Sequence, residues 1–374
     1  MFWNLILTDS CNLCCTYCRG KDMSGGGCDT TAVAVAVDDT LPSDLAVDPD
    51  LLYAFLARDP DAALMFYGGE PLLRMDLVEQ ILEEAPVRRF LLQTNGTLLS
   101  GLDPDLVRRF DTIFLSVDGP EAVTDRYRGS GTFKKVIAGA RHCAGAGFSG
   151  ELIARMTVAE ATDIEASVRY LSGNDLFPFS SIHWQIDANF AEDYYARAFA
   201  PWVHGSYNPG ISRLVDAWVG AMRREGRVLR WYPFLVPVDD LLHDRPSPLR
   251  CGSGHANYTI MTDGSIAPCP CMVGMRDWYV GHIASADPRN IRVVPVGGEC
   301  TSCDIRDFCG GRCLYSNIIR PWPPEGRSLV RSTVCHLHAA LTAVLPEIRA
   351  LIDEGRIEAR DFFHEKFQGC EVIP

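Results

Sequence analysis

The chain is predicted to be an α/β protein organised around a parallel sheet, on the basis of three observations. Short apolar runs typical of strands alternate with segments of helical periodicity through residues 2–224. Six such strand–helix units follow one another, and polar or glycine-rich turns come after the strands. Successive units of this kind form a parallel sheet with right-handed crossovers, which is either doubly wound or curled into a partial barrel.

The expected elements succeed one another at short intervals. Strands are expected at residues 5–7, 63–67, 90–93, 113–117, 152–158 and 182–186. Helices are expected at residues 51–56, 77–84, 105–110, 133–145, 164–171 and 211–224, with a later one at 337–352. Residues 21–48, which include Ser24-Gly25-Gly26-Gly27, are expected to form an irregular excursion, either a lid or a substrate-facing loop. The alternation is expected to stop near residue 225.

Polar turns follow four of the expected strands. They are a cysteine-rich loop at residues 8–20, Gly68-Gly69-Glu70-Pro71, Thr94-Asn95-Gly96 and Ser116-Val117-Asp118-Gly119. In barrels of parallel strands, functional loops follow the carboxyl ends of the strands, so we expect these turns to converge on one rim. Four further strand-end side chains either face a ligand there or satisfy local hydrogen bonds, namely Gln93, Arg155, Gln185 and Asp187.

Composition and charge exclude several classes of protein. The 374 residues suffice for one large or two ordinary domains, and a net charge of −13 without a basic run argues against nucleic-acid binding. The first residues lack the pattern of a signal peptide, and no stretch of about 18 apolar residues was found, so a cytoplasmic protein without a membrane span is expected. Fifteen cysteines in such a protein indicate metal binding or catalysis rather than disulfides.

The cysteine loop carries Cys11, Cys15 and Cys18 at the spacing C-x3-C-x2-C, with Tyr17 before the last. Three thiolates from one loop can hold three irons of a 4Fe–4S cluster and leave the fourth iron open. A zinc knuckle, or cysteines serving as small apolar residues, is the alternative. The loop resembles the cluster loop of radical SAM (S-adenosylmethionine) enzymes, where the amino and carboxylate groups of SAM chelate the open iron.

The turn after the second strand resembles the GGE motif of the same family. The resemblance implies that Gly68 and Gly69 let the backbone approach SAM and that Glu70 accepts a hydrogen bond from its amino group. Taken alone, this motif also fits an ordinary turn. Further SAM contacts are implied for residues at the same rim, namely Tyr17, Asn95, Ser116, Asp118 and Arg128. For Arg128 the alternative is a surface salt bridge.

A second set of cysteines occupies the last third of the chain. Its pattern resembles the seven-cysteine pattern of the SPASM domain, in which radical SAM enzymes carry two auxiliary 4Fe–4S clusters. The resemblance implies a partial (β/α)6 TIM barrel at residues 1–225, a SPASM domain at 226–336 and a C-terminal helix with its tail at 337–374. A zinc site at Cys300-x2-Cys303 is the alternative, although it leaves the other positions unexplained.

The family pattern divides these cysteines between two clusters. The outer cluster would take Cys300, Cys303, Cys309 and Cys335, and the inner cluster Cys251, Cys269 and Cys313. The inner set lacks a fourth ligand, for which Cys271 is a candidate, or the site is open to substrate. Five cysteines fall outside the ten assigned ones, namely Cys14, Cys28, Cys143, Cys271 and Cys370, and Cys143 is expected in the core.

The resemblance implies a reaction class. A reduced cluster passes an electron to SAM and yields a 5′-deoxyadenosyl radical, which SPASM members use to modify ribosomally made peptides or proteins by crosslinking, epimerisation or oxidation. Formylglycine formation, as in anaerobic sulfatase maturation, ranks second, because Pro270 stands where those enzymes carry an aspartate thought to act as a base. A non-catalytic iron–sulfur electron carrier or zinc-binding structural protein is the alternative of another class.

The same resemblance suggests partners. The barrel begins near residue 2, so recognition of a leader peptide would need a separate leader-binding protein or loops of the barrel itself. A precursor peptide or protein is the expected substrate, and a ferredoxin- or flavodoxin-type protein is the expected electron donor.

Overall fold

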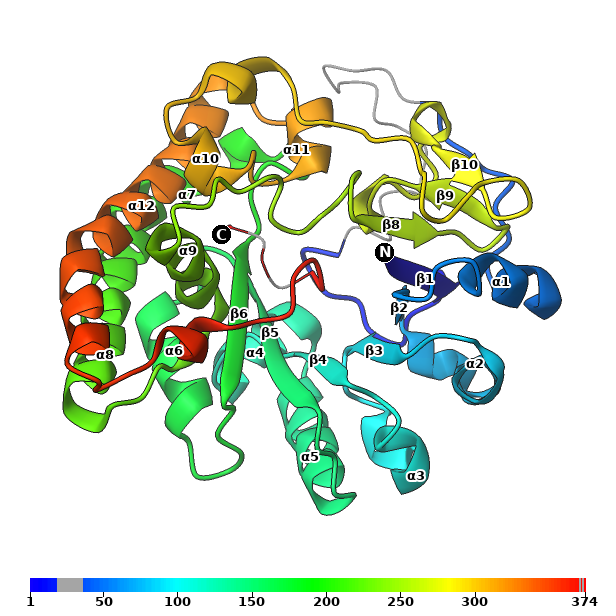
Figure 1. Cartoon of the computed structure of the whole chain (residues 1–374), viewed down its shortest axis with the longest axis horizontal. Helices are drawn as coiled ribbons and strands as arrows, with labels where there is room; N and C mark the ends of the chain where they lie inside the picture. The colour runs from blue at the N-terminus through cyan, green and yellow to red at the C-terminus, as the bar shows by residue number, and fades with distance from the viewer. Residues whose placement is uncertain (19–35, 370, 372) are drawn as a thin grey trace.

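The computed structural model describes residues 1–18, 36–369, 371 and 373–374. In this part of the chain a ten-stranded sheet has the order β10-β9-β8-β1-β2-β3-β4-β5-β6-β7 (Figure 1). Each of β1 to β7 runs parallel to its neighbour, in sequential order. The curved parallel sheet with helices outside it confirms the expected partial barrel.

The strands of the sheet are mostly short. They are β1 (Phe2–Thr8), β2 (Ala63–Gly68), β3 (Arg89–Thr94), β4 (Thr112–Ser116), β5 (Glu151–Val158), β6 (Ser181–Ile186), β7 (Arg230–Trp231), β8 (Asn257–Ile260), β9 (Ser265–Ala267) and β10 (Gly281–His282). The α-helices are α1 (Pro49–Leu56), α2 (Met75–Glu84), α3 (Pro104–Val107), α4 (Glu121–Arg128), α5 (Thr132–Gly145), α6 (Ile164–Gly173), α7 (Phe199–Trp202), α8 (Asn208–Glu225), α9 (Tyr232–Leu242), α10 (Arg306–Cys309), α11 (Leu314–Ile319) and α12 (Pro324–Asp353).

The six expected strands all form, whereas the expected helices and the end of the alternation need four corrections. The helix expected at residues 105–110 is the single turn α3, and α4 was missed because only Thr124 and Arg128 of its residues are buried, so no apolar stripe marks it. The alternation does not stop near residue 225, because β7 and α9 follow α8. The helix expected at residues 337–352 begins at Pro324, since its first turns are polar.

Side chains alternate between the two faces of the strands. The outward set, such as Leu64 and Phe66 of β2, packs beneath the helices in the main core. The inward set, together with Tyr232 and Val236 of α9, forms a separate apolar floor inside the barrel; its strand residues are Phe2, Ala63, Met65, Leu91, Phe114 and Ile153. Complete burial of one large apolar side chain stabilises the fold by about 1.5–3 kcal/mol. Inward-facing residues nearer the carboxyl ends of these strands therefore stand above an apolar base.

The last third of the chain extends the sheet and then returns along the barrel. β8 pairs parallel with β1, and the antiparallel strands β9 and β10 continue from it. The long helix α12 packs on α8, where the hydroxyl of Ser212 lies 2.9 Å from His336 Nε2. The expected division at residues 336/337 lies within α12, and the three-part division stays a prediction.

One helix in the described residues, α12, is long and apolar enough to cross a membrane by length and composition, although no such stretch was expected. Its apolar positions include Val334, Leu337, Leu341 and Ile348, all of which are buried in the main core. The hydrophobicity of the helix therefore serves packing within this fold.

Candidate functional site

The cysteine loop follows β1, as expected, and its three thiols lie close to one another. Burial raises the pKa of the Cys11 and Cys15 thiols, and the neighbouring Cys18 thiol acts in the same direction on both. The backbone N–H of Leu13 donates to Cys11 Sγ at 3.4 Å, and Asn95 Nδ2 donates to the same sulfur at 3.8 Å. Such donors stabilise thiolates, the form in which cysteine binds metal.

Tyr17 fastens this loop to the end of β4. Its hydroxyl donates to Asp118 Oδ2, and its ring lies 5.4 Å from the guanidinium carbon of Arg128. Asp118 also binds Arg128 through both oxygens at 2.8 Å and accepts the N–H of Thr157 at 2.8 Å. A further backbone bond joins Thr16 N to Tyr127 O at 2.9 Å. The loop after β1, the turn after β4 and strand β5 are thus joined by one network of hydrogen bonds centred on Asp118.

This arrangement corrects the alternative considered for Arg128. The residue does make a salt bridge, but it is buried, with 6% of its surface exposed, and it is not a surface residue. Burial lowers the pKa of Arg128, but Asp118, Tyr17 and Cys15 together raise it by more, so the pKa of Arg128 is raised and its charge is held. Burial raises the pKa of Cys15, and the positive charge of Arg128 acts against this rise. Arg128 therefore lies close to the cysteine loop.

The glycines after β2 approach the cysteine loop itself. Gly69 N donates to Thr8 O at 2.8 Å, and a Cβ on Gly69 would lie 2.1 Å from Ser10 O. Gly68 has a φ of +137°, and a Cβ there would lie 2.3 Å from Thr8 O. The two glycines are thus required for backbone-to-backbone contact between the turn and the loop, whatever contact either makes with a ligand.

Glu70 braces the same turn against β3. Its carboxylate accepts hydrogen bonds from Thr94 Oγ1 at 2.7 Å, Asn95 N at 2.7 Å and Leu72 N at 3.1 Å. Burial raises the pKa of Glu70, while these donors act against that rise. Asn95 in turn donates to Asn12 Oδ1 at 2.8 Å. The expected rim residues from β1, β2 and β3 therefore belong to one hydrogen-bonded network.

Above the apolar floor, the barrel interior is polar. Tyr67 and Arg155 continue the inward faces of β2 and β5, Gln93 lies within hydrogen-bonding reach of Tyr67, and Ser116 pairs with Arg155. Burial raises the pKa of Tyr67 to about 12. Arg155 Nη1 donates to the carbonyl of Gly369 at 2.7 Å, a contact that the sequence did not predict.

Two other expected rim residues make different contributions. Gln185 is half-buried on the inward face of β6. Asp187, by contrast, pairs with Arg197 at 3.3 Å.

Some residues singled out in the sequence, namely Ser24-Gly25-Gly26-Gly27, Cys28 and Cys370, lie outside the described residues. Cys143 is fully buried in α5, as expected.

The inner cysteine set converges beside this polar interior. Cys251 and Cys269 belong to one buried apolar cluster, against which Cys271 packs. The pKa of the Cys269 thiol is raised, first by a hydrogen bond with Cys271 and next by burial, and Cys313 and Cys251 act in the same direction. Cys271 and Cys269 add to the rise that burial causes in the pKa of Tyr67, which places them next to the barrel interior. Cys271, the candidate fourth ligand of the inner set, thus lies beside Cys269.

Three of the four outer cysteines, Cys300, Cys303 and Cys309, line a cavity of about 500 Å³, and Cys313 of the inner set lines it as well. Asn317 Nδ2 donates to Cys300 Sγ at 3.3 Å, and Arg331 Nε donates to Cys303 Sγ at 3.4 Å. Four arginines also line this cavity, namely Arg312, Arg320, Arg327 and Arg331. Burial raises the pKa of Cys335, and the neighbouring Cys303 thiol acts in the same direction.

These donor sets fit iron–sulfur clusters better than single zinc ions. Within the described residues, no three His, Cys, Asp or Glu side chains come together as a group for one metal ion. A zinc ion requires its sulfurs about 2.3 Å away around one centre. The ligands of a cubic cluster each bind a different iron and stay further apart. A cavity edged by thiols, N–H donors and arginines suits such an anionic group.

Comparison with known proteins agrees with this geometry. Residues 5–165 match the model of the Radical SAM superfamily. "Pre-heme d1 synthase" of Dinoroseobacter shibae is 33% identical over 168 residues, 44% of this chain and 37% of that protein. "Probable GTP 3',8-cyclase" of Methanocella arvoryzae is 31% identical over 138 residues, 36% of this chain and 40% of that protein. The chain therefore spans less than half the length of these relatives.

Solved structures resemble a larger part of the fold. "Native anSMEcpe with bound AdoMet" has a TM-score of 0.66 at 18% identity and covers 93% of this chain and 100% of that one. SuiB of Streptococcus suis bound to S-adenosylmethionine has a TM-score of 0.53 at 15% identity, with coverage of 85% and 74%. At these identities the likeness shows a shared fold.

Proposed function

Residues 5–165 form a radical SAM domain, and from this premise we propose that the chain modifies a ribosomally made peptide or protein. The observation that carries the proposal is the position of the Cys11, Cys15 and Cys18 loop at the rim of a barrel with a polar interior. A bound cluster with SAM would supply a 5′-deoxyadenosyl radical, a group that removes hydrogen from unactivated carbon. The chain's own residues position the reacting groups and exclude water.

The rim residues have distinct roles in this proposal. Cys11, Cys15 and Cys18 would hold the cluster. Glu70 would keep the turn at Gly68-Gly69 against the loop through its three hydrogen bonds, and one lone pair would remain for an ammonium group. Asn95, Ser116, Asp118 and Arg128 would shape the adjoining SAM site, with the Asp118–Arg128 pair neutral as a unit.

Two further clusters are part of the proposal. The outer cavity at Cys300, Cys303 and Cys309 would hold one, with Cys335 as its fourth ligand. Cys251, Cys269, Cys271 and Cys313 would hold the other, which completes the inner set from within this chain. Tyr67 lies between that inner set and the barrel interior, so it would face both the substrate and the inner cluster.

Formylglycine formation is the second candidate. Fold likeness to the anSMEcpe structures is compatible with it. However, Pro270 follows Cys269 and cannot accept a proton, and the nearby Tyr67 has its pKa raised to about 12, which makes it a poor base near neutral pH. A peptide modification that needs no base at position 270 is therefore favoured over formylglycine formation.

A matched pair of cysteine variants tests the proposed activity. The reconstituted protein, given dithionite and SAM without oxygen, should release 5′-deoxyadenosine, which chromatography quantifies. Cys15→Ala should abolish this product, whereas Cys14→Ala, which changes an exposed neighbour, should keep it. Release of no 5′-deoxyadenosine by a protein that holds its clusters would contradict the enzymatic role.

Mass spectrometry of a short peptide encoded beside this chain and co-expressed with it identifies the reaction. A loss of about 2 Da would indicate a crosslink, and a gain of about 14 Da would indicate methylation. Conversion of a serine or cysteine to formylglycine would instead establish the second candidate. We propose a cytoplasmic setting with a ferredoxin- or flavodoxin-type electron donor, and a separate leader-binding protein where the substrate carries a leader.

A further inference from the structure

The tail after α12 runs into the interior of the barrel. Figure 1 marks the C-terminus next to α9 and the end of β6. The exposed fractions of Gln368, Glu371 and Ile373 are 2%, 4% and 1%, so these residues are enclosed. Chain ends of most domains are poorly ordered and solvated unless specific contacts hold them. The contacts that hold this tail therefore describe a binding surface.

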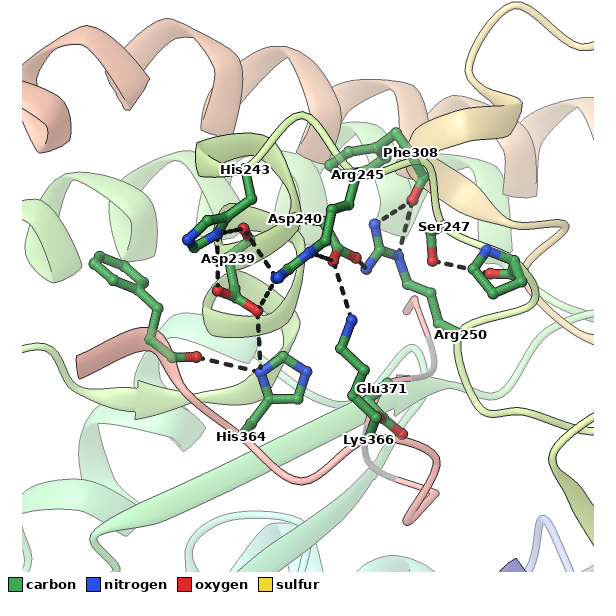
Figure 2. Close-up of polar contacts among 12 residues, drawn as sticks. Asp239, Asp240, His243, Arg245, Ser247, Arg250, Phe308, His364, Lys366 and Glu371 are labelled. Atoms are coloured by element: carbon green, nitrogen blue, oxygen red, sulfur yellow. Dashed lines mark hydrogen bonds and ion pairs between the residues drawn. The ribbon is translucent and has the colours of Figure 1, made fainter. Parts of the chain in front are cut away.

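The tail enters at the amino ends of the strands. The carbonyl of Phe363 accepts from Arg230 Nη1 at 3.2 Å, and Arg89, at the start of β3, pairs with Glu365. Next, Lys366 Nζ lies 3.6 Å from Asp240 Oδ1 of α9, and His364 Nδ1 lies 4.0 Å from Asp239 Oδ2 (Figure 2). Two ion pairs, Arg89–Glu365 and Lys366–Asp240, thus hold the tail at the entrance of the barrel.

Inside the barrel, the backbone of the tail is bound at successive heights. Asn257 Nδ2 donates to the carbonyl of Phe367 at 3.1 Å, and Asn257 pairs with Phe2 at the lower end of the sheet. Arg155 Nη1 donates to the carbonyl of Gly369 at 2.7 Å, and Arg155 pairs with Ser116 at the rim. The tail therefore climbs from the apolar floor toward the rim that carries the cysteine loop.

Side chains of the tail also occupy defined places. The Phe367 ring meets the His255 ring edge-on at 5.3 Å between centroids, and it contacts the backbone at Gly252, where a Cβ would lie 2.9 Å from it. Gln368 Nε2 donates to the hydroxyl of Tyr232 at 3.0 Å. Gly369 has a φ of +89° and no Cβ beside Arg155. The surroundings thus accept an aromatic residue, a polar residue and then a glycine.

We propose that the barrel interior between Asn257 and Arg155 is a peptide-binding channel, which residues 366–369 occupy as an internal ligand until a peptide substrate displaces them. The inference rests on the proposed peptide-modifying function and names its substrate class. That class is a peptide whose backbone carbonyls reach Asn257 and Arg155, with an aromatic residue two positions before a glycine. Recognition through carbonyls tolerates different side chains elsewhere, as peptide channels do.

The channel is tested with a fluorescent peptide that has the sequence of residues 362–374. The full chain, reconstituted with its clusters, should bind this peptide weakly, because its own tail competes. Phe367→Ala removes the ring between His255 and Gly252, so it should loosen the tail and strengthen peptide binding by about tenfold or more. Phe363→Ala is the matched control, because that ring is 67% exposed and lies outside the channel.

A second variant keeps the test independent of one substitution. The chain ended after Phe363 should bind the same peptide at least as tightly as Phe367→Ala, and a scrambled peptide should not bind. Equal, weak binding by Phe367→Ala, Phe363→Ala and the shortened chain, with circular dichroism showing all three folded, would overturn the channel. A peptide substrate modified at the same KM by all three would overturn displacement while leaving the proposed function intact. Tight binding with no modified substrate would retain the channel and reject the function.

Discussion

The hydroxyl of Tyr17 donates a hydrogen bond to Asp118 Oδ2 at 2.5 Å, which joins the cysteine loop after β1 to the turn after β4. These residues are 101 positions apart in the sequence, and both oxygens of Asp118 are also engaged by Arg128. The loop that would carry the cluster is therefore held by a buried charged pair as well as by its own short turns.

Tyr17→Phe tests this attachment. The change removes one donor to a buried carboxylate and should lower the free energy of unfolding by about 1–3 kcal/mol. Urea denaturation followed by tryptophan fluorescence measures it. Tyr195→Phe removes a similar hydroxyl-to-carboxylate bond from a residue that is 80% exposed, and it should leave the free energy of unfolding almost unchanged. Equal effects for the two variants would argue against the attachment.

Asp118→Asn should have a larger effect. Arg128 would remain charged and buried without a carboxylate, which typically costs about 3–5 kcal/mol. The same denaturation experiment provides the value. Asp105→Asn breaks an exposed pair with Arg108 and should cost less than about 1 kcal/mol. A small loss at Asp118 would show that the pair does not support the fold.

Gly69→Ala should displace the cysteine loop. The added Cβ would lie 2.1 Å from Ser10 O, a backbone atom that can move only together with the loop. We expect less iron bound after reconstitution and loss of 5′-deoxyadenosine release, while circular dichroism stays near that of the parent. Gly145→Ala, at the end of α5 with no atom within 4 Å of the new Cβ, should leave both unchanged. Normal iron content in Gly69→Ala would be the contrary result.

Cys271→Ala tests the fourth ligand of the inner set. Mössbauer spectra of the reconstituted protein should show altered ligation of one cluster, because a thiolate beside Cys269 is gone. Cys14→Ala, an exposed cysteine outside the assigned sets, is the control and should give parental spectra. Spectra and activity identical to those of the parent in Cys271→Ala would remove this residue from the ligand set.

The docked tail should respond to pH through His364. Burial lowers the pKa of His364, against the opposing influence of Phe362 O, Asp239 and Asp240, while Lys366 adds to the lowering. In a released tail the imidazole would titrate near its ordinary value of about 6.5. As pH falls below that value, this imidazole gains a proton only in the released tail, so His364 weakens docking between about pH 6.5 and its lowered pKa. Glu371 of the same tail acts in the opposite sense, because burial raises its pKa to about 8 and the docked carboxyl is protonated at a higher pH than the released one.

Hydrogen exchange of the amides at residues 366–369 measures this response. His364→Asn keeps the contribution of Glu371 but cannot take up a proton at position 364. The protection at about pH 5 relative to about pH 7, corrected for the intrinsic pH dependence of exchange, should therefore be lower in the parent chain than in His364→Asn. A change of the same size in both proteins would exclude His364 as the cause.

The periodicity of the sequence predicted the sheet well because the outward faces of its strands are apolar and regular. It missed α4, whose buried residues are Thr124 and Arg128 rather than an apolar stripe. It predicted too late a start for α12, which begins at Pro324, because polar residues such as Arg327 and Arg331 precede the apolar part of this helix. Helices that bury polar groups or begin with polar turns carry too little periodic signal for such a prediction.

The sequence named candidate residues for the site, and their roles as ligands stay a prediction. Cysteine spacing and the family resemblance gave three candidate ligand sets, of which only Cys11, Cys15 and Cys18 lie in one short loop. Spacing could not reveal that two nitrogens of the Arg128 guanidinium donate to Asp118, or that Arg155 donates to the carbonyl of Gly369, which is 214 positions away. Such pairs depend on tertiary packing, so they have no local pattern.

The parallel pairing of β1 with β8 would set the distance for electron transfer between clusters in the proposed enzyme. β1 leads directly into the loop of Cys11, whereas β8 begins six residues after Cys251, and the two strands pair in register. A rigid ladder instead of a flexible linker would therefore separate the two candidate metal-binding regions. A chain cut at residue 225 would lose this spacing and would also leave the edge of β1 open to pairing with other molecules.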